Sequence, residues 1–127
     1  MLFRSKITVV LRKAYGGGYI AMNSRHLRAD FVFAWPSAEI AVMGPEGAEN
    51  IIFRKEITSA ENPEEMRRLK IKEYKEKFAN PYVAAAKGYV DSVIEPEETR
   101  DCILHALDVS TTKKVERPNK KHGIPPF

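Results

Sequence analysis

The sequence predicts an α/β fold, with short strands in the first half of the chain and mainly helices in the second. Three observations predict this class. Short apolar runs, rich in β-branched and aromatic residues, end at glycine or proline within the first 45 residues. Strand-like and helix-like segments alternate there. Farther along, Asn62-Pro63-Glu64-Glu65 and Pro96-Glu97-Glu98 are typical of helix starts, because proline fits the first helical position and acids favour the first turn.

The expected strands are apolar runs of strand length, bounded by residues that interrupt a ladder. We expect strands or extended segments at Ile7 to Leu11, Asp30 to Trp35, Glu39 to Met43 and Tyr89 to Ile94. The first run is rich in β-branched residues and leads into Gly16-Gly17-Gly18. The second and third are stopped by Pro36 and by Gly44-Pro45.

The expected helices carry apolar side chains at helical spacing. We place them at Tyr19 to Leu27, Gly47 to Ile57, Pro63 to about Phe78, Tyr82 to Lys87 and Pro96 to Asp108. The side chains expected to face the core from the three longest of these helices are Ile51, Ile52 and Phe53, then Met66, Leu69, Tyr74 and Phe78, then Ile103, Leu104 and Leu107.

The composition fits one compact domain. The 127 residues are 43% hydrophobic and 30% charged, with a net charge of +4, which is typical of an ordinary globular core. No apolar run approaches the roughly 18 residues of a membrane helix, and no signal-peptide pattern opens the chain, so we expect a cytoplasmic protein without direct membrane insertion. The single Cys102 excludes an internal disulfide framework and, with three scattered histidines, a zinc module.

Two further features of the composition concern partners and origin. The tail, residues 113–127, is basic through Lys113, Lys114, Arg117, Lys120 and Lys121. It has neither a recognised nucleic-acid-binding fold nor interleaved aromatic residues beside it, so we expect no nucleic-acid partner, and a solvated or partner-docking terminus fits better. The absence of glutamine, with many Lys, Arg and Glu residues, resembles the composition of thermophile proteins.

The succession of strand, triple glycine and helix is the most informative local feature. Three successive glycines, Gly16 to Gly18, allow backbone angles that a side chain would forbid, and they let a ligand approach bare amides. The N-terminus of a following helix adds free N–H groups and a positive dipole. Such a turn can hold a phosphate or stabilise an anion that develops during a reaction. It can equally be a tight turn with no ligand.

Two functional interpretations of this turn stay open on the residues alone. Gly16-x-Gly18-x-x-Ala21 matches the loose dinucleotide-binding fingerprint, but the acid expected at the end of the next strand is missing. An oxyanion hole needs only two convergent N–H groups. Side chains offer little else, because the three histidines lie far apart and Cys102 fits a core position better than a nucleophile. If the protein acts on a substrate, backbone amides are the expected agents.

The glycine turn and several later segments resemble a known family. The matching segments are Ile7 to Ala21, Ser24 to Asp30, Ala34 to Gly44, Phe78 to Pro81, Gly88 to Asp91, Val93-Ile94, Pro96, Glu98 to Arg100 and Lys120 to Gly123. In order, and over nearly the whole chain, they resemble the carboxyltransferase β subunits of biotin-dependent acyl-CoA carboxylases. That family includes propionyl-CoA and acetyl-CoA carboxylase β subunits and the α subunit of methylmalonyl-CoA decarboxylase.

The resemblance implies a crotonase-like fold of strand-helix units, with oxyanion holes at helix N-termini. Family members have two such domains, the first holding the acyl-CoA and the second receiving carboxybiotin. This chain resembles only the last part of the second domain, so residues 1–112 would be that part, residues 113–127 a basic tail, and the chain alone inactive. The implied partners are the CoA-binding remainder of the subunit, a biotin carboxyl carrier protein and further copies of the chain.

The resemblance also assigns roles at the glycine turn, position by position. The amides of Gly17 and Gly18 would be the catalytic groups, stabilising the biotin ureido enolate as carbon dioxide leaves. The remaining residues of the implied biotin pocket are Tyr15, Gly16, Tyr19, Ile20, Met43 and Gly44. Many members have Ala at the Gly18 position, which changes no donor, and many propionyl-selective members have Asp at the Ile20 position. Biotin and an acyl-CoA are the implied cofactor and substrate, with no metal.

Our hypothesis from the sequence is therefore a fragment of a carboxyltransferase subunit that supplies the biotin-side oxyanion hole of a carboxylase or decarboxylase. Two alternatives stay open, a non-catalytic oligomerisation module and a dinucleotide-binding domain. If the chain is a fragment of a carboxyltransferase subunit, part of its apolar surface would be covered by missing sequence or by a partner.

Overall fold

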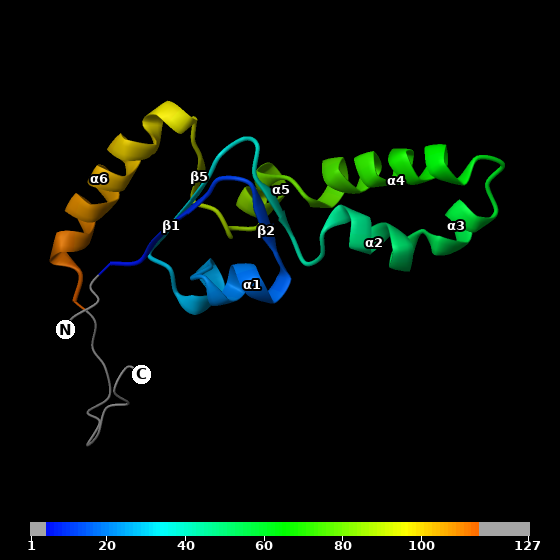
Figure 1. Cartoon of the computed structure of the whole chain (residues 1–127). Helices are drawn as coiled ribbons and strands as arrows, with labels where there is room; N and C mark the ends of the chain where they lie inside the picture. Colours follow the sequence, from blue (N-terminus) through cyan, green and yellow to red (C-terminus); the bar gives the residue numbers. More distant parts are fainter. Residues whose placement is uncertain (1–4, 115–127) are drawn as a thin grey trace, which may run out of the picture.

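The computed structural model describes residues 5–114, which form two small parallel sheets flanked by helices (Figure 1). One sheet contains, in spatial order, β1 (Ile7–Val10), β3 (Phe31–Ala34) and β5 (Ser92–Val93). The other contains β2 (Lys13–Tyr15) and β4 (Glu39–Ala41). All paired strands run parallel. Because parallel neighbours require crossover connections, this arrangement confirms the predicted α/β class.

Helices connect and flank these strands. Within the described residues they are α1 (Gly16–Ala21), α2 (Pro45–Ile52), α3 (Arg54–Thr58), α4 (Pro63–Phe78), α5 (Pro81–Ala86) and α6 (Thr99–Val109). Short 3-10 turns lie at Arg25–Leu27, Pro96–Glu98 and Ser110–Thr112. Figure 1 shows α2, α3 and α4 extending together to one side of the sheets and α6 on the other. Across residues 5–114, no helix combines the length and the apolar character that crossing a bilayer requires.

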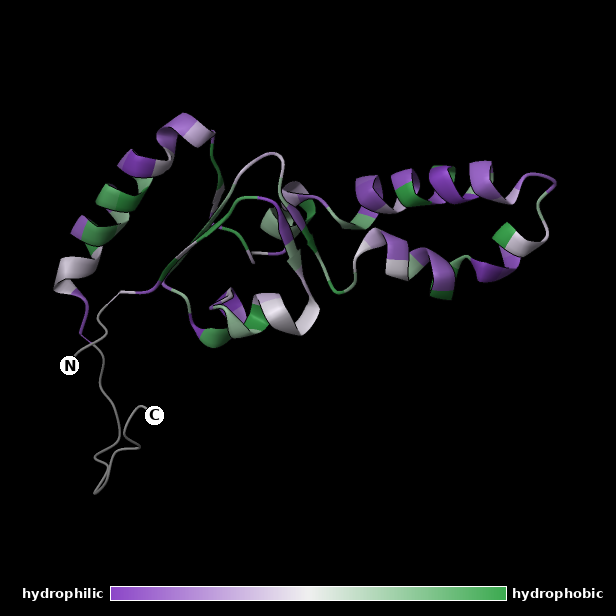
Figure 2. Ribbon diagram, viewed as in Figure 1, coloured by the Kyte–Doolittle hydropathy of each residue, from purple (hydrophilic) through white to green (hydrophobic). Residues whose placement is uncertain are grey.

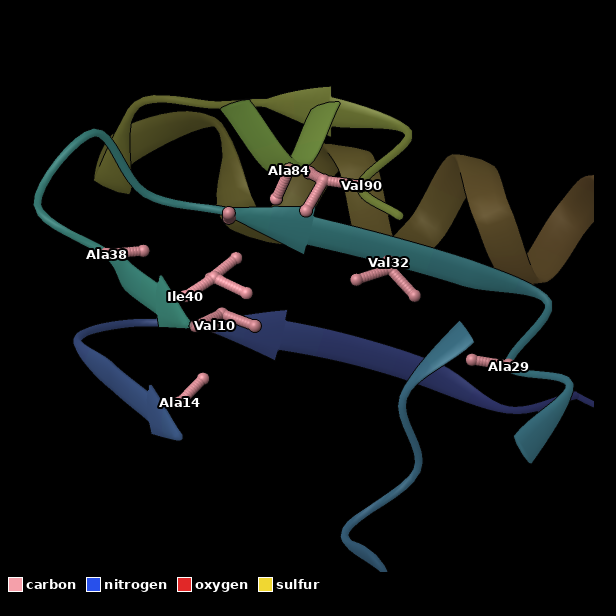
Figure 3. Close-up of a cluster of buried hydrophobic side chains, with 9 residues drawn as sticks. Val10, Ala14, Ala29, Val32, Ala38, Ile40, Ala84 and Val90 are labelled. Carbon is pink, nitrogen blue, oxygen red and sulfur yellow. The ribbon is translucent and has the colours of Figure 1, made fainter. Parts of the chain in front are cut away.

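The main core cluster joins the two sheets. Its most deeply buried members include Val32 and Ala34 of β3, neither of which is exposed at all. Figure 3 labels most of this cluster, namely Val10, Ala14, Ala29, Val32, Ala38, Ile40, Ala84 and Val90. Alanine predominates, which lets the backbones of neighbouring elements approach closely. This packing fixes the two-stranded sheet, and with it the glycine turn, against the rest of the domain.

The helix at the glycine turn begins and ends earlier than the predicted range Tyr19 to Leu27. Helix α1 starts at Gly16 itself, because a left-handed φ of +53° turns the chain directly out of β2. It ends at Ala21, and Asn23, with a φ of 86°, separates it from the following 3-10 turn. The Thr8 hydroxyl donates to the Asn23 carbonyl at 2.6 Å and holds this break in place. The short strand β2 was not predicted, since three residues give no periodic signal.

The predicted helix Gly47 to Ile57 is in fact two helices, α2 and α3, which meet at Phe53. The prediction that Ile51 and Ile52 are buried is wrong, because the two residues are 69% and 54% exposed. Ala48 turns inward instead and is fully buried. A small side chain at this point lets α2 lie close to α4, and the large side chains are left outside.

The predicted apolar stripes of α4 and α6 face the core only in part. In α4, Tyr74 is buried, whereas Leu69 and Phe78 are mostly exposed. In α6 the buried residue is Ala106, while Leu104 and Leu107 are about half exposed. Figure 2 shows α4 as largely hydrophilic and α6 with bands of hydrophobic residues. The last helix is also delayed, since the segment from Pro96 first forms a 3-10 turn.

The start of α4 confirms the predicted capping pattern. The Asn62 side chain accepts a hydrogen bond from the Glu65 amide at 3.3 Å, and proline occupies the first turn. Helix α5 begins in the same way, with the Asn80 side chain accepting from the Val83 amide at 2.9 Å. Each cap satisfies one of the amides that a helix start leaves free.

Candidate functional site

The glycine turn lies where β2 ends beside β4, and its three glycines differ in what they require. A Cβ built on Gly16 would lie 2.9 Å from the carbonyl oxygen of Val42. With its left-handed φ, this position is closed to side chains by both backbone strain and contact with main chain. A Cβ on Gly17 or Gly18 would meet nothing within 4 Å. These two glycines therefore border open space.

The amides at the start of α1 are free to donate to an outside acceptor. Tyr15 is the N-cap residue, with an extended backbone and no side-chain capping bond. The first-turn N–H groups, including those of Gly17 and Gly18, have no acceptor within the helix. Both residues are exposed, and the first turn contains no acid. The positive end of the helix is therefore not neutralised by a side chain of the first turn.

A cavity of about 560 Å³ opens beside this turn, a volume typical of small-molecule sites. The start of α1 forms one wall. Other walls come from the end of β4, from Ile52 of α2, from Tyr74 and Phe78 of α4, and from α5. The lining is mainly apolar, with a few polar side chains such as His26 and Lys87. This mixture is typical of a ligand pocket.

Half of the eight residues that the sequence assigned to the site line this cavity. They are Gly16, Gly17, Tyr19 and Ile20. Gly18 follows Gly17 in α1 but does not contribute to the lining. The other three lie behind the turn rather than in the cavity wall. There the ring of Tyr15 is 3.3 Å from a Cβ built at Gly44, and the Met43 carbonyl accepts a hydrogen bond from the Tyr74 hydroxyl at 3.4 Å.

The Tyr19 hydroxyl is a buried polar atom at this site. It has no hydrogen-bond partner within the described part of the chain. Burial raises the pKa of Tyr19, and the positive charge of Arg25 only partly offsets this effect. The hydroxyl therefore keeps its proton at neutral pH and remains an unused donor. A buried donor of this kind is costly unless another group pairs with it.

Several lining residues were not predicted as site residues. Tyr74 and Phe78 were expected to face the core, and His26, Lys87 and Tyr89 were not assigned to the site. The His26 and Tyr89 rings lie with centroids 4.9 Å apart, and the His26 Nδ1 is 3.3 Å from the Ser24 hydroxyl. Nothing in the local sequence marks these residues, because only the packing of α4 and α5 beside α1 brings them together. Within residues 5–114, no group of three or more His, Cys, Asp and Glu side chains is placed to hold a metal ion.

Comparison with known proteins places this geometry in a family. The sequence profile described as the carboxyl transferase domain matches residues 4–125. The chain belongs to the carboxyl transferase domain family. It is 64% identical over 118 residues to the methylmalonyl-CoA carboxyltransferase 12S subunit of Propionibacterium freudenreichii, covering 93% of this chain and 22% of that protein. It is 54% identical over 122 residues to the methylmalonyl-CoA decarboxylase subunit alpha of Propionigenium modestum, covering 96% of this chain and 24% of that protein.

Solved structures agree with the sequence comparison. The crystal structure of transcarboxylase 12S, a hexamer with methylmalonyl-CoA and methylmalonic acid bound, superposes with a TM-score of 0.87 at 62% identity, over 97% of this chain and 24% of that one. The geranyl-CoA carboxylase β subunit of P. aeruginosa gives a TM-score of 0.68 at 25% identity, over 84% of this chain and 20% of that one. These neighbours confirm the crotonase-like fold.

The chain spans less than a quarter of the length of the relatives described here, between 20% and 24%. Most of the length of those proteins therefore has no counterpart in this sequence.

Proposed function

We propose that this chain forms the biotin-side wall of the active site in a carboxyltransferase that moves a carboxyl group between carboxybiotin and an acyl-CoA. One observation carries the proposal. In a chain of this family, the free amides at the start of α1 border a largely apolar cavity of about 560 Å³.

The residues of the cavity fit the head group of biotin, which combines an apolar bicyclic ring with a polar ureido carbonyl. The side chains of Ile20, Tyr74 and Phe78 offer apolar surface for the ring. The amides of Gly17 and Gly18 would donate hydrogen bonds to the carbonyl oxygen. When bound, carboxybiotin supplies the carboxyl group, and its ureido oxygen gains negative charge as that group departs.

The contribution of the chain is to hold donors where this charge develops. In measured oxyanion holes, removing one such donor costs about 3–4 kcal/mol of transition-state stabilisation. A rigid helix start provides two donors without reorganisation, and this chemistry requires no general base from the chain. Tyr19, Gly16 and Ile20 would shape the pocket, and Tyr15, Met43 and Gly44 would support it from behind.

The partners are part of the same proposal. The acyl-CoA site would lie in a CoA-binding domain outside this sequence, and a biotin carboxyl carrier protein would deliver the carboxybiotin. The half-exposed Leu104 and Leu107, about one turn apart on α6, support coverage of this helix by further protein, since contiguous apolar surface marks interaction sites. The 12S relative is a hexamer, and we propose that this chain also acts in a homo-oligomer.

The proposed domain boundaries and the proposed cellular location rest on the sequence. Residues 1–112 would be the C-terminal part of the second carboxyltransferase domain, and residues 113–127 its basic tail, of which 115–127 lie outside the described residues. We propose a cytoplasmic enzyme from an organism that lives at elevated temperature, on the composition given above.

The test is to co-express the chain with a protein that carries the CoA-binding domain and to measure biotin-dependent decarboxylation of methylmalonyl-CoA. Gly18→Pro removes one amide donor in the first helical turn, where the amide has no acceptor within the helix. Gly18→Ala keeps the donor as a matched control, and its Cβ meets nothing within 4 Å. We expect Gly18→Pro to lower turnover about 10²- to 10³-fold and Gly18→Ala to leave it nearly unchanged. Equal turnover in the two variants would contradict the proposal. Clear turnover by the chain alone would contradict the need for a partner domain.

A further inference from the structure

A polar cluster lies behind the glycine turn and does not line the cavity. The Tyr15 hydroxyl, at the end of β2, donates a hydrogen bond to Oε2 of Glu39 in β4. The Nζ of Lys75 in α4 donates to Oε1 of the same carboxylate at 3.0 Å. Glu39 is therefore held from two sides, by a strand and by a long helix.

The strand register explains why these side chains meet. In the parallel ladder, Lys13 lies opposite Glu39 and Tyr15 lies opposite Ala41. Because alternate residues of a strand share a face, Tyr15 and Glu39 project from the same face of the two-stranded sheet. A tyrosine ring is long enough to reach back to the diagonal neighbour, and α4 covers this face with Lys75. The Glu39 side chain is only 19% exposed.

The Tyr15 ring also touches the start of a second helix. A Cβ built at Gly44 would lie 3.3 Å from Cε2 of the ring. Tyr15 is the N-cap residue of α1, and Gly44 is the N-cap residue of α2. Both helices contribute to the cavity wall. One ring, anchored through its hydroxyl, therefore lies beside both helix starts.

The ionisation states of Tyr15 and Glu39 favour this hydrogen bond near neutral pH. Burial raises the pKa of Tyr15, and the hydrogen bond to Glu39 and its charge raise it further, so the phenol keeps its proton. Burial also acts to raise the pKa of Glu39, but the hydrogen bonds from Tyr15 and Lys75 outweigh it, and the pKa lies below its usual value. The donor stays protonated and the acceptor stays charged.

We infer that Glu39 is a positioning residue, which acts through Tyr15 to hold the amides of Gly17 and Gly18 in place relative to the cavity. Neither Glu39 nor Tyr15 lines the cavity, so neither is a catalytic residue in this inference. Its consequence for turnover rests on the proposed function, whereas the positioning itself is a property of the fold.

Two measurements separate these two claims. The first is amide NMR of the isotopically labelled 127-residue chain, with Glu39→Gln and Tyr15→Phe as variants. Tyr15→Phe keeps the ring and its packing, so it serves if Glu39→Gln does not fold. The control is Glu73→Gln, which removes a carboxylate of α4 that pairs with Lys70 and Lys77 and not with the cluster around Glu39. We expect the Gly17 and Gly18 resonances to move in the two cluster variants only, because a displaced helix start changes the surroundings of both amides.

The second measurement is steady-state kinetics of the assembled carboxyltransferase carrying the same variants. We expect kcat to fall about tenfold, with KM for the acyl-CoA unchanged, because small displacements of reacting groups reduce turnover without affecting a distant binding site. A Glu39→Gln, Tyr15→Phe double variant should lose less than the two single variants combined, because both weaken the bond between Tyr15 and Glu39, whereas Glu39→Gln also removes the charge that pairs with Lys75. Unchanged Gly17 and Gly18 amides would overturn the inference. Altered amides with unchanged kcat would instead overturn the proposed function and leave the positioning intact.

Discussion

Alanine at Gly16 and alanine at Gly17 should have opposite effects on stability, although the two positions are adjacent. At Gly16 the left-handed φ of +53° costs an alanine about 1–2 kcal/mol. Its Cβ would lie 2.9 Å from the Val42 carbonyl oxygen, which is main chain and cannot move alone. Forcing extra atoms into such contacts costs about 1–3 kcal/mol. We therefore expect Gly16→Ala to destabilise the chain by about 3 kcal/mol.

The matched control is Gly17→Ala in the next position of the same helix. A Cβ there meets nothing within 4 Å, and alanine is favoured over glycine in a helix by up to about 1 kcal/mol. The free energy of unfolding should therefore stay the same or rise slightly. The two variants should differ by about 3–4 kcal/mol, well beyond the error of an unfolding experiment.

Urea unfolding followed by fluorescence measures this difference. Trp35 is the single tryptophan and is partly buried beside Phe33 in the cluster that α6 covers, so its emission reports loss of the packed state. The midpoint should fall in Gly16→Ala with an unchanged slope. If Gly16→Ala were no less stable than Gly17→Ala, the left-handed glycine would not be what turns the chain from β2 into α1.

Two further predictions concern a helix cap and pH. Asn80→Ala removes the acceptor of the Val83 amide and should lower the free energy of unfolding by about 1 kcal/mol. Asn80→Asp keeps an acceptor and should retain most of the stability. An equal loss of stability in Asn80→Asp and Asn80→Ala would contradict the capping role. Burial acts to raise the pKa of Asp30, but the hydrogen bonds from Lys113 and the Lys6 amide outweigh it and the pKa is lowered. A folded pKa below the unfolded value means that this stabilisation is present above about pH 4 and is lost as the pH falls through the folded pKa. In chemical unfolding at a series of pH values, Asp30→Asn should therefore be less stable than the parent at pH 7, and the two should converge at low pH; a gap that widened on acidification would show the sign to be wrong.

The fold could be predicted where the sequence carries a long or chemically marked signal. The start of α4 is such a case, because the Asn62 cap and the following proline act within one turn. The β-branched run of β1 is another. The three-residue strand β2 and the break at Phe53 carry no comparable local signal. Which side of α2 or α6 is buried depends on how closely helices approach, and the alanines Ala48 and Ala106 decided it against the larger residues beside them.

In the candidate site, too, features set by neighbouring residues could be predicted from the sequence, and features set by tertiary packing could not. The free amides of the glycine turn follow from consecutive residues, so the sequence predicted them. The opposite wall of the cavity could not be predicted, because Tyr74 and Phe78 reach it only through the packing of α4. The link from Tyr15 to Glu39 likewise depends on the register between two short strands, which nothing in either strand specifies alone.

The central claim is that the amides at the start of α1 and the cavity beside them bind the head group of biotin. Titration of the isotopically labelled chain with biotin, followed by amide NMR, tests it most directly. We predict saturable shifts of the Gly17, Gly18 and Ile20 amides, with the amide of Ala106 in α6 unchanged. Amides at the glycine turn that stay unmoved while biotin is raised to millimolar concentration would contradict the claim.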